Sequence, residues 1–288
     1  MRIAHYIAIA SAVVLVALLY WAVPTTPPAG ATKATAGGSA HQDAAGQPAM
    51  PQVVPASVDS ISAASLALLP QHAREELSHI NRELALLKDS SAMVPLYEQS
   101  SALWLEHKQL PMAAWARAKA AHLARSEKKL NFAGQFFLDL MHEATTPAMQ
   151  AWEAQGAVDC LNEALALNPD NDTTKLALAS AYIEGTVAPM SGVSILREMV
   201  AKDPDHIPAN LMLGRLSIQS GQFDKAVARL EHVLEVEPRN REGLYFLAEA
   251  YKGMGEKEKA IQTFRKLEGI VNNPDFTKDI EAYINSFK

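Results

Sequence analysis

One interval of 34 to 36 residues recurs in the second half of the chain, and it limits the possible folds more than any other feature. An Asn-Pro, Asp-Pro or Glu-Pro dipeptide returns at steps of 35, 34 and 36 residues, with its proline at Pro169, Pro204, Pro238 and Pro274. Small and apolar residues keep nearly the same step: Leu178 and Ala179 return as Leu213 and Gly214 and then as Leu247 and Ala248, Gly192 as Ala226 and Ala260, and Gly221 as Gly255. A unit of this length has too little core to fold alone, so such units stack on one another.

Each unit is predicted to be a pair of helices. Apolar residues between the prolines return every three or four positions, as in Leu244, Leu247 and Tyr251. The recurrent small residues allow neighbouring helices to approach closely, and Gly221 and Gly255 suit a turn in which φ is positive. The prolines end the second helix, because the residue before a proline disfavours the α conformation. The pattern therefore predicts an all-α protein.

Two segments resemble the tetratricopeptide repeat (TPR) family: LYFLAEAYKGMGEKEKAIQTFRKL, residues 244–267, and LMLGRLSIQSGQFDKAVARLEHVLEVEP, residues 211–238. The resemblance is close over residues 169–271 and weaker over 91–168. It implies a right-handed α-α solenoid of TPR helix pairs, with about three clear units and up to five in all. A capping helix at 275–287 is expected to close the array, because a terminal repeat needs a polar outer face.

The weaker units have their own expected features. The unit before 172–203 has a first helix at 131–143 and a turn near Thr146, and its helices should be longer than later ones by about three residues each or more. An earlier unit covers 91–127. Residues 61–90 form a helical lead-in to the solenoid of 91–288. The apolar faces expected in the flanking helices are Leu77, Ile80, Leu84 and Leu87 in 71–88, and Phe276, Ile280, Ile284 and Phe287 in the capping helix.

The N-terminus is predicted to be a transmembrane signal anchor, residues 1–23. No charged residue occurs from Ile7 to Val23, Arg2 precedes this run, and Tyr20 and Trp21 lie at its far end. These features favour a single span with the N-terminus in the cytoplasm. Residues 24–60, rich in Pro, Ala and Gly, are expected to be a disordered linker. The predicted location is the bacterial inner membrane with the C-terminal domain in the periplasm, and the alternative is secretion after signal cleavage.

Composition excludes several functions. The net charge is −6 with 26 Lys and Arg residues, which disfavours a basic surface for nucleic acid. A single cysteine, Cys160, excludes an internal disulfide and any site of several thiolates. We find no phosphate-binding glycine loop, nucleophile elbow or zinc-protease motif, so we expect no cofactor, no metal site and no catalytic residue.

The resemblance to TPR proteins implies a protein-binding groove along the first helices. Its residues, matched by position, are Leu176, Ser180, Ile183, Leu211, Arg215, Ile218, Gln219, Tyr245, Glu249 and Lys252. The chaperone-binding TPR subgroup holds a terminal carboxylate in a basic clamp, but here only Arg215 and Lys252 are basic and the clamp's asparagine is missing. Another possibility is that the chain's own N-terminal helix covers some of these positions.

The sequence therefore predicts a membrane-tethered, extracytoplasmic TPR scaffold and not an enzyme. Its partner would be a protein or peptide segment in the groove, and its role the assembly of a cell-envelope complex. The anchor and the array together are weakly similar to the TPR factors of cytochrome c biogenesis, which gives a chaperone-like alternative. A self-associating structural scaffold is the other alternative.

Overall fold

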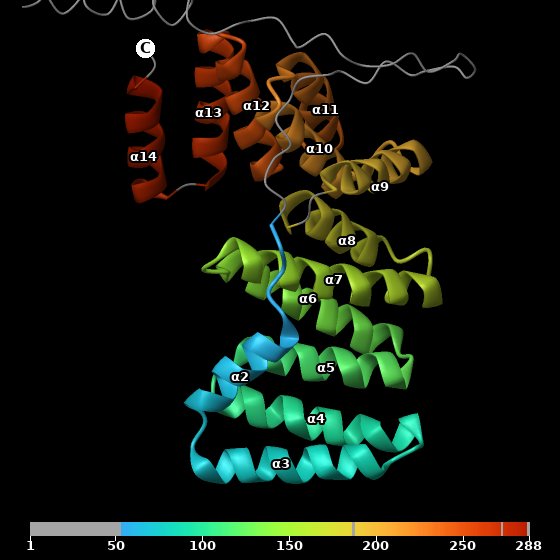
Figure 1. The fold of residues 1–288 in the computed structure, drawn as a ribbon. Coiled ribbons are helices and arrows are strands. Elements are labelled where there is room, and N and C mark those ends of the chain that lie inside the picture. The colour runs from blue at the N-terminus through green and yellow to red at the C-terminus, as the bar shows by residue number, and fades with distance from the viewer. Residues whose placement is uncertain (1–52, 186–187, 272, 287–288) are drawn as a thin grey trace, which may run out of the picture. The chain divides into compact units, whose positions relative to one another are not determined.

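The computed structural model describes residues 53–185, 188–271 and 273–286. These residues form helices and no strand. The helices, labelled in Figure 1, are α2 (Val58–Leu68), α3 (Gln71–Leu86), α4 (Ser90–Glu106), α5 (Leu110–Ala124), α6 (Glu127–Glu143), α7 (Pro147–Leu167), α8 (Asp172–Gly185), α9 (Pro189–Lys202), α10 (Ile207–Gln219), α11 (Phe223–Val236), α12 (Arg241–Gly253), α13 (Lys257–Val271) and α14 (Pro274–Asn285). The all-α prediction is confirmed.

The predicted anchor and nearly all of the predicted linker lie outside the described residues. Within the described part of the chain, no helix combines the length and the apolar character that crossing a membrane requires. The first described helix, α2, begins at Val58, where the Ser57 side chain accepts a hydrogen bond from the backbone N–H of Ser60. The first three residues of α2 therefore lie within the predicted linker.

Successive helices pack in pairs, and each pair packs on the next (Figure 1). The pairs are α4–α5, α6–α7, α8–α9, α10–α11 and α12–α13, which gives the five units expected at most. Helices α6 and α7 have 17 and 21 residues against 13 and 14 in α10 and α11. The predicted turn at Thr146 and the greater length of this pair are both confirmed.

Small residues are buried where neighbouring helices meet. Ala226 and Ala260 are fully buried, as the repeat register requires. A Cβ on Gly192 would lie 2.4 Å from the backbone oxygen of Ala179, so α9 contacts the backbone of α8 at this point. The hydrophobic core consequently runs through the stack as a series of clusters between successive helices.

The turns follow the predicted chemistry with one exception. Gly221 and Gly255 have φ of +71° and +79°, a conformation that costs a residue without Cβ little. Helices α7, α9 and α11 each end in a C-cap residue that directly precedes a proline, as expected. Pro274 instead begins α14, whose N-cap is Asn273, because the first helical position needs no N–H donor.

The two flanks of the array are also helical. The helix expected at 71–88 is α3, and a second helix, α2, precedes it. Leu77 and Ile80 are buried in a cluster with residues of α4 and α5, whereas Leu87 is the C-cap of α3. At the other end, Ile280 and Ile284 of α14 are buried against the α12–α13 pair. Phe287 lies outside the described residues.

Candidate functional site

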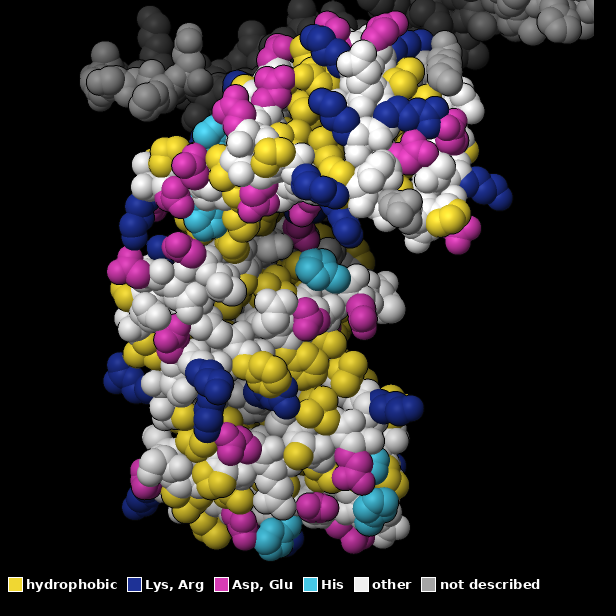
Figure 2. Space-filling view, turned by 180° about the vertical axis from the view of Figure 1, so that it is seen from behind, with side chains coloured by type: hydrophobic (Ala, Val, Ile, Leu, Met, Phe, Trp, Pro, Cys, Tyr) yellow, Lys and Arg dark blue, Asp and Glu magenta, His cyan; other side chains and the backbone are white. Residues whose placement is uncertain are grey.

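Two adjoining cavities lie along the first helices of three successive pairs. One, of about 490 Å³, is lined by α4, α5 and α6, and the other, of about 360 Å³, by α6, α7 and α8. Lys128 and Phe132 of α6 line both cavities. The cavities therefore adjoin at these two residues, and we call the two together, along α4, α6 and α8, the α6 groove. Figure 2 shows hydrophobic side chains beside Lys and Arg side chains midway along the face seen from behind.

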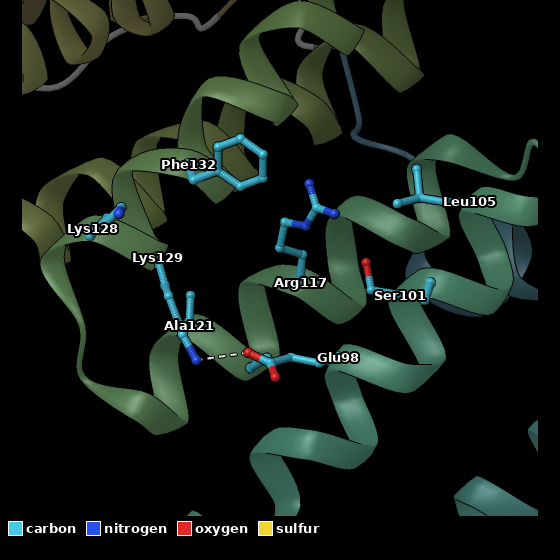
Figure 3. Close-up of a pocket in the computed structure, with 10 residues that line it drawn as sticks. Glu98, Ser101, Leu105, Arg117, Ala121, Lys128, Lys129 and Phe132 are labelled. Carbon is cyan, nitrogen blue, oxygen red and sulfur yellow. Dashed lines mark hydrogen bonds and ion pairs between the residues drawn. The ribbon is translucent and has the colours of Figure 1, made fainter.

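Arg117 and Phe132 form the centre of this groove (Figure 3). The guanidinium carbon of Arg117 lies 4.7 Å from the ring centroid of Phe132 and 5.2 Å from that of Phe136, within the range of a cation–π contact. Phe132 is 60% exposed despite being a large aromatic residue. Burial lowers the pKa of Arg117, and in the described part of the chain no carboxylate is paired with it.

The other charged residues of the groove differ in their contacts. Lys129 Nζ donates to Glu98 Oε1 at 2.7 Å across the α4–α6 gap (Figure 3). Lys128 makes no hydrogen bond or ion pair with the residues that the structure describes. Both lysines lie near the start of α6 and face the same cavity as Arg117.

The wall of the smaller cavity is a closed hydrogen-bond network. One oxygen of Glu127 accepts hydrogen bonds from the side-chain amides of Asn131, Asn168 and Asn171 at 3.3, 3.1 and 2.7 Å. The Thr174 hydroxyl donates to Asn131 at 2.7 Å. This network ties the first turn of α6 to the start of α8, so it gives the groove a firm floor.

The groove residues predicted on α8 and α10 divide between core and surface. Leu211 is only 7% exposed and lies in the cluster of α10, α11 and α12, against which Ile218 also packs. Leu176 and Ile183 pack half-buried against the α8–α10 cluster. Ser180 is half-buried and Gln219 is exposed. The apolar members of this set therefore support stacking between units.

Arg215 belongs to a charged network that links three first helices. Its Nη2 donates to Glu184 Oε1 at 2.6 Å, and His142 Nε2 lies 2.8 Å from the other Glu184 oxygen. Burial by itself would raise the pKa of Glu184, but the hydrogen bonds and charges of Arg215 and His142 lower it. The Arg215 guanidinium is thus paired with a carboxylate of α8.

The predicted residues on α12 lie against α14 or at the surface. Tyr283 of α14 donates to Glu249 at 2.5 Å, and Lys252 Nζ lies 3.9 Å from the Tyr283 ring centroid. Burial, and then the hydrogen bond and charge of Glu249, raise the pKa of Tyr283. The chain's own C-terminal helix covers this part of the first-helix side. Tyr245 stays 41% exposed and packs edge-on against Phe246 and Phe264.

Three residues of the α6 groove did not emerge from the sequence: Arg117, Lys128 and Phe132. They lie in the units with the weakest repeat resemblance, where the groove positions cannot be matched by register. The only signal was the run from Lys128 to Phe132, in which an aromatic residue follows two lysines at the start of a helix. Within the described residues, no group of three or more His, Cys, Asp or Glu could hold a metal ion.

Comparison with known proteins agrees with this architecture. The tetratricopeptide repeat family model matches residues 192–242 and 218–276. Residues 192–276 of the chain therefore match the TPR family. A relative, the mouse (Mus musculus) interferon-induced protein with tetratricopeptide repeats 2, is 25% identical over 146 residues, which are 48% of this chain and 31% of that protein. The chain thus spans about a third of the length of this relative.

Solved structures with a similar arrangement of helices include MamA and YrrB. MamA is 17% identical, with a TM-score of 0.47 over 64% of this chain and 93% of MamA. YrrB, described as a TPR protein with an unusual peptide-binding site, is 18% identical, with a TM-score of 0.45 over 65% of this chain and 91% of YrrB.

Proposed function

We propose that this protein is a TPR scaffold that binds a segment of another protein in the α6 groove. The observation that carries the proposal is that two cavities adjoin at Phe132, whose side chain is 60% exposed between them. An exposed aromatic ring in a mostly apolar depression is typical of an anchor for a partner side chain. The groove runs across several helices, which suits an extended segment or a helix.

The remaining predicted residues are proposed to extend this surface. Tyr245 and Gln219 are exposed on the first helices of later units, and Arg215 is partly exposed while paired with Glu184. Leu211 is too deeply buried to contact a partner without a rearrangement of its cluster. We therefore place the main contacts on α4, α6 and α8, and secondary contacts on α10 and α12.

We further propose that the scaffold is tethered to the bacterial inner membrane and works in the periplasm. The support is the uncharged run 7–23, the preceding Arg2 and the Pro-rich residues that follow. A tether of this kind raises the effective concentration of the scaffold near membrane-bound partners. Assembly of a cell-envelope complex fits such a location, and a chaperone-like role in cytochrome c biogenesis is a narrower form of the same proposal.

Site-specific photo-crosslinking tests the groove. A photoreactive phenylalanine analogue at Phe132 of the full chain should give adducts with a partner protein in cells. The same analogue at Leu86, which is 82% exposed at the end of α3, is the control. Adducts from Leu86 alone, especially with a second copy of the chain, would favour the self-associating scaffold and reject the groove.

A fusion experiment tests the tether. A reporter that is active only outside the cytoplasm, joined after residue 52, should be active and should sediment with membranes. An inactive reporter would contradict the orientation. A mature N-terminus found near residues 24–36 would instead show a cleaved signal and a secreted protein.

A further inference from the structure

We infer that the α6 groove selects an acidic segment, in which a carboxylate side chain stands next to an aromatic or aliphatic one. This inference rests on the proposed function, because it names the chemistry of the segment that the groove binds. It follows from three observations: the local charge, the lack of a carboxylate partner for Arg117 among the described residues, and the apolar lining.

The groove is basic although the protein is acidic. The charged residues lining the larger cavity are Arg117, Lys128, Lys129 and Glu98, three basic against one acidic, which gives +2. The chain as a whole has a net charge of −6. Lys128 is the one charged residue among those lining the smaller cavity. A positive groove on a negative molecule attracts acidic segments and repels basic ones.

Arg117 is the strongest candidate for the carboxylate contact. It is half-buried, and Figure 3 shows it pointing into the cavity between Phe132 and Leu105. Contact with the Phe132 and Phe136 rings holds the guanidinium in place without using its hydrogen-bond donors. A partly buried cation whose donors lack a carboxylate gains more from an incoming one than an exposed lysine does. Lys128, at the boundary of both cavities, supplies a second positive charge.

The apolar side chain of the segment has its own place in the groove. Ala102, Leu105, Ala120 and Ala121 line the larger cavity together with the exposed Phe132 ring. These five side chains carry no polar group, so this part of the cavity favours an aliphatic or aromatic side chain. Phe132 separates this lining from the amide-rich wall of the smaller cavity, where the main chain of the segment can continue.

The carboxylate is assigned to a side chain inside the segment and not to a chain end. The two cavities meet at Lys128 and Phe132, so a segment lying along the groove passes these residues in its middle. A terminal carboxylate placed there would leave one of the two cavities without a ligand. The inference therefore predicts tolerance of extra residues on both sides of the acidic and apolar pair.

Binding of labelled peptides to the purified full chain tests this inference. The reference peptide has a central Glu-Phe-Asp in a Gly-Ser background and an amidated C-terminus, and fluorescence anisotropy gives its affinity. A Gln-Phe-Asn peptide should bind about tenfold more weakly, which is about 1.4 kcal/mol, since it loses the hydrogen bonds between a charged carboxylate and the guanidinium. A Glu-Gly-Asp peptide should lose a similar factor, because it lacks the apolar anchor.

Variants of the protein assign the effect to the groove. Arg117→Gln should remove most of the preference for Glu-Phe-Asp over Gln-Phe-Asn, whereas Arg241→Gln should preserve it. The two variants lose the same charge, and Arg241 is exposed at the start of α12, away from the groove residues. Arg117→Lys keeps the charge without the planar stack and should retain part of the preference. Unchanged helicity by circular dichroism shows that each variant is folded.

Several outcomes would overturn the inference while leaving the proposed function standing. Equal binding of Glu-Phe-Asp and Gln-Phe-Asn, with adducts still forming at Phe132, means that the groove binds segments without regard to acidity. Binding of a peptide only when its C-terminus is a free carboxylate means terminal recognition. Binding of anionic lipid vesicles but of no peptide means that the basic surface faces a membrane. Loss of the Phe132 adducts themselves would remove the proposed function as well.

Discussion

Replacement of Glu153 by Gln should raise the free energy of unfolding more at neutral and alkaline pH than at acidic pH. Glu153 lies in α7, its side chain is 3% exposed, and its Oε2 atom is buried without a hydrogen-bond partner in the described structure. Burial raises the pKa of Glu153 to about 7 from an ordinary value of 4.5. A carboxyl group is therefore kept where its charged form is disfavoured.

The sign and size of the effect follow from proton linkage. Because the pKa is higher in the folded state, the folded protein binds more protons between pH 4.5 and 7, and stability falls as the pH rises through this window. Complete ionisation costs about 3 kcal/mol, because the pKa rises from 4.5 to about 7 and each pKa unit corresponds to about 1.36 kcal/mol. Part of this cost is already present at pH 5. The gain from Glu153→Gln should therefore be about 2 kcal/mol larger at pH 8 than at pH 5.

Urea unfolding followed by circular dichroism at both pH values measures this difference. The control is Glu106→Gln, at an exposed carboxyl group at the end of α4, for which the difference between the two pH values should be small. An amide at position 153 changes packing and hydrogen bonding equally at both pH values, so the comparison isolates ionisation. A Glu153→Gln effect that is the same at pH 5 and pH 8 would refute the reasoning.

Two further predictions concern the joints between helices. Gly192→Ala should destabilise the protein by about 1–3 kcal/mol in urea unfolding, since its Cβ would lie 2.4 Å from the Ala179 backbone oxygen. Gly269→Ala should stabilise it by about 0.5–1 kcal/mol, because a Cβ there would have no atom within 4 Å. Equal effects at the two glycines would contradict the observed helix contact. Arg215→Ala should cost about 0.5–1 kcal/mol at pH 7, because the pair is partly exposed. Since Glu184 has a lowered pKa, its ion pair stabilises the fold above the ordinary value of 4.5 and is lost as the pH falls below it, so the cost should shrink in unfolding curves at lower pH; a cost that grew on acidification would show that this pair is not its source.

The repeat architecture could be predicted because its determinants are local and periodic. At Ala226 and Gly214 a larger side chain would collide with a neighbouring helix. At Gly221 a residue with a Cβ would have to adopt an unfavourable positive φ. A constraint of this kind acts once per unit, so it appears in the sequence at the repeat interval. Helix α2 lacks such a partner unit, and its Ser- and Ala-rich sequence continues the composition of the linker. Pro274 differs from its prediction as a helix end, because only the structure of α14 shows that this proline begins a helix.

The groove residues could be predicted only in part, since their environment depends on contacts between distant positions. Register matching located Glu249 and Lys252 on a first helix, but Tyr283, 31 to 34 residues later, decides that they contact α14. Arg215 likewise appears as an available cation in the sequence, and Glu184 on the preceding first helix pairs with it. Exposure and pairing are properties of the stack, and a single unit does not encode them.

The candidate site lies in the units whose resemblance to the repeat is weakest, and there is a physical reason for this. Residues that define the repeat are those that stack one helix on another. A unit that follows the pattern closely therefore uses its apolar side chains for contacts with neighbouring helices, as Leu211 does. The α4–α7 units depart from the pattern. There Phe132 remains exposed, and Arg117 is paired with no carboxylate among the described residues. Side chains not needed for stacking are the ones available to a partner. In this protein, the poorly matched units are therefore the better place to look for binding, and the closely matched units the better place to look for stability.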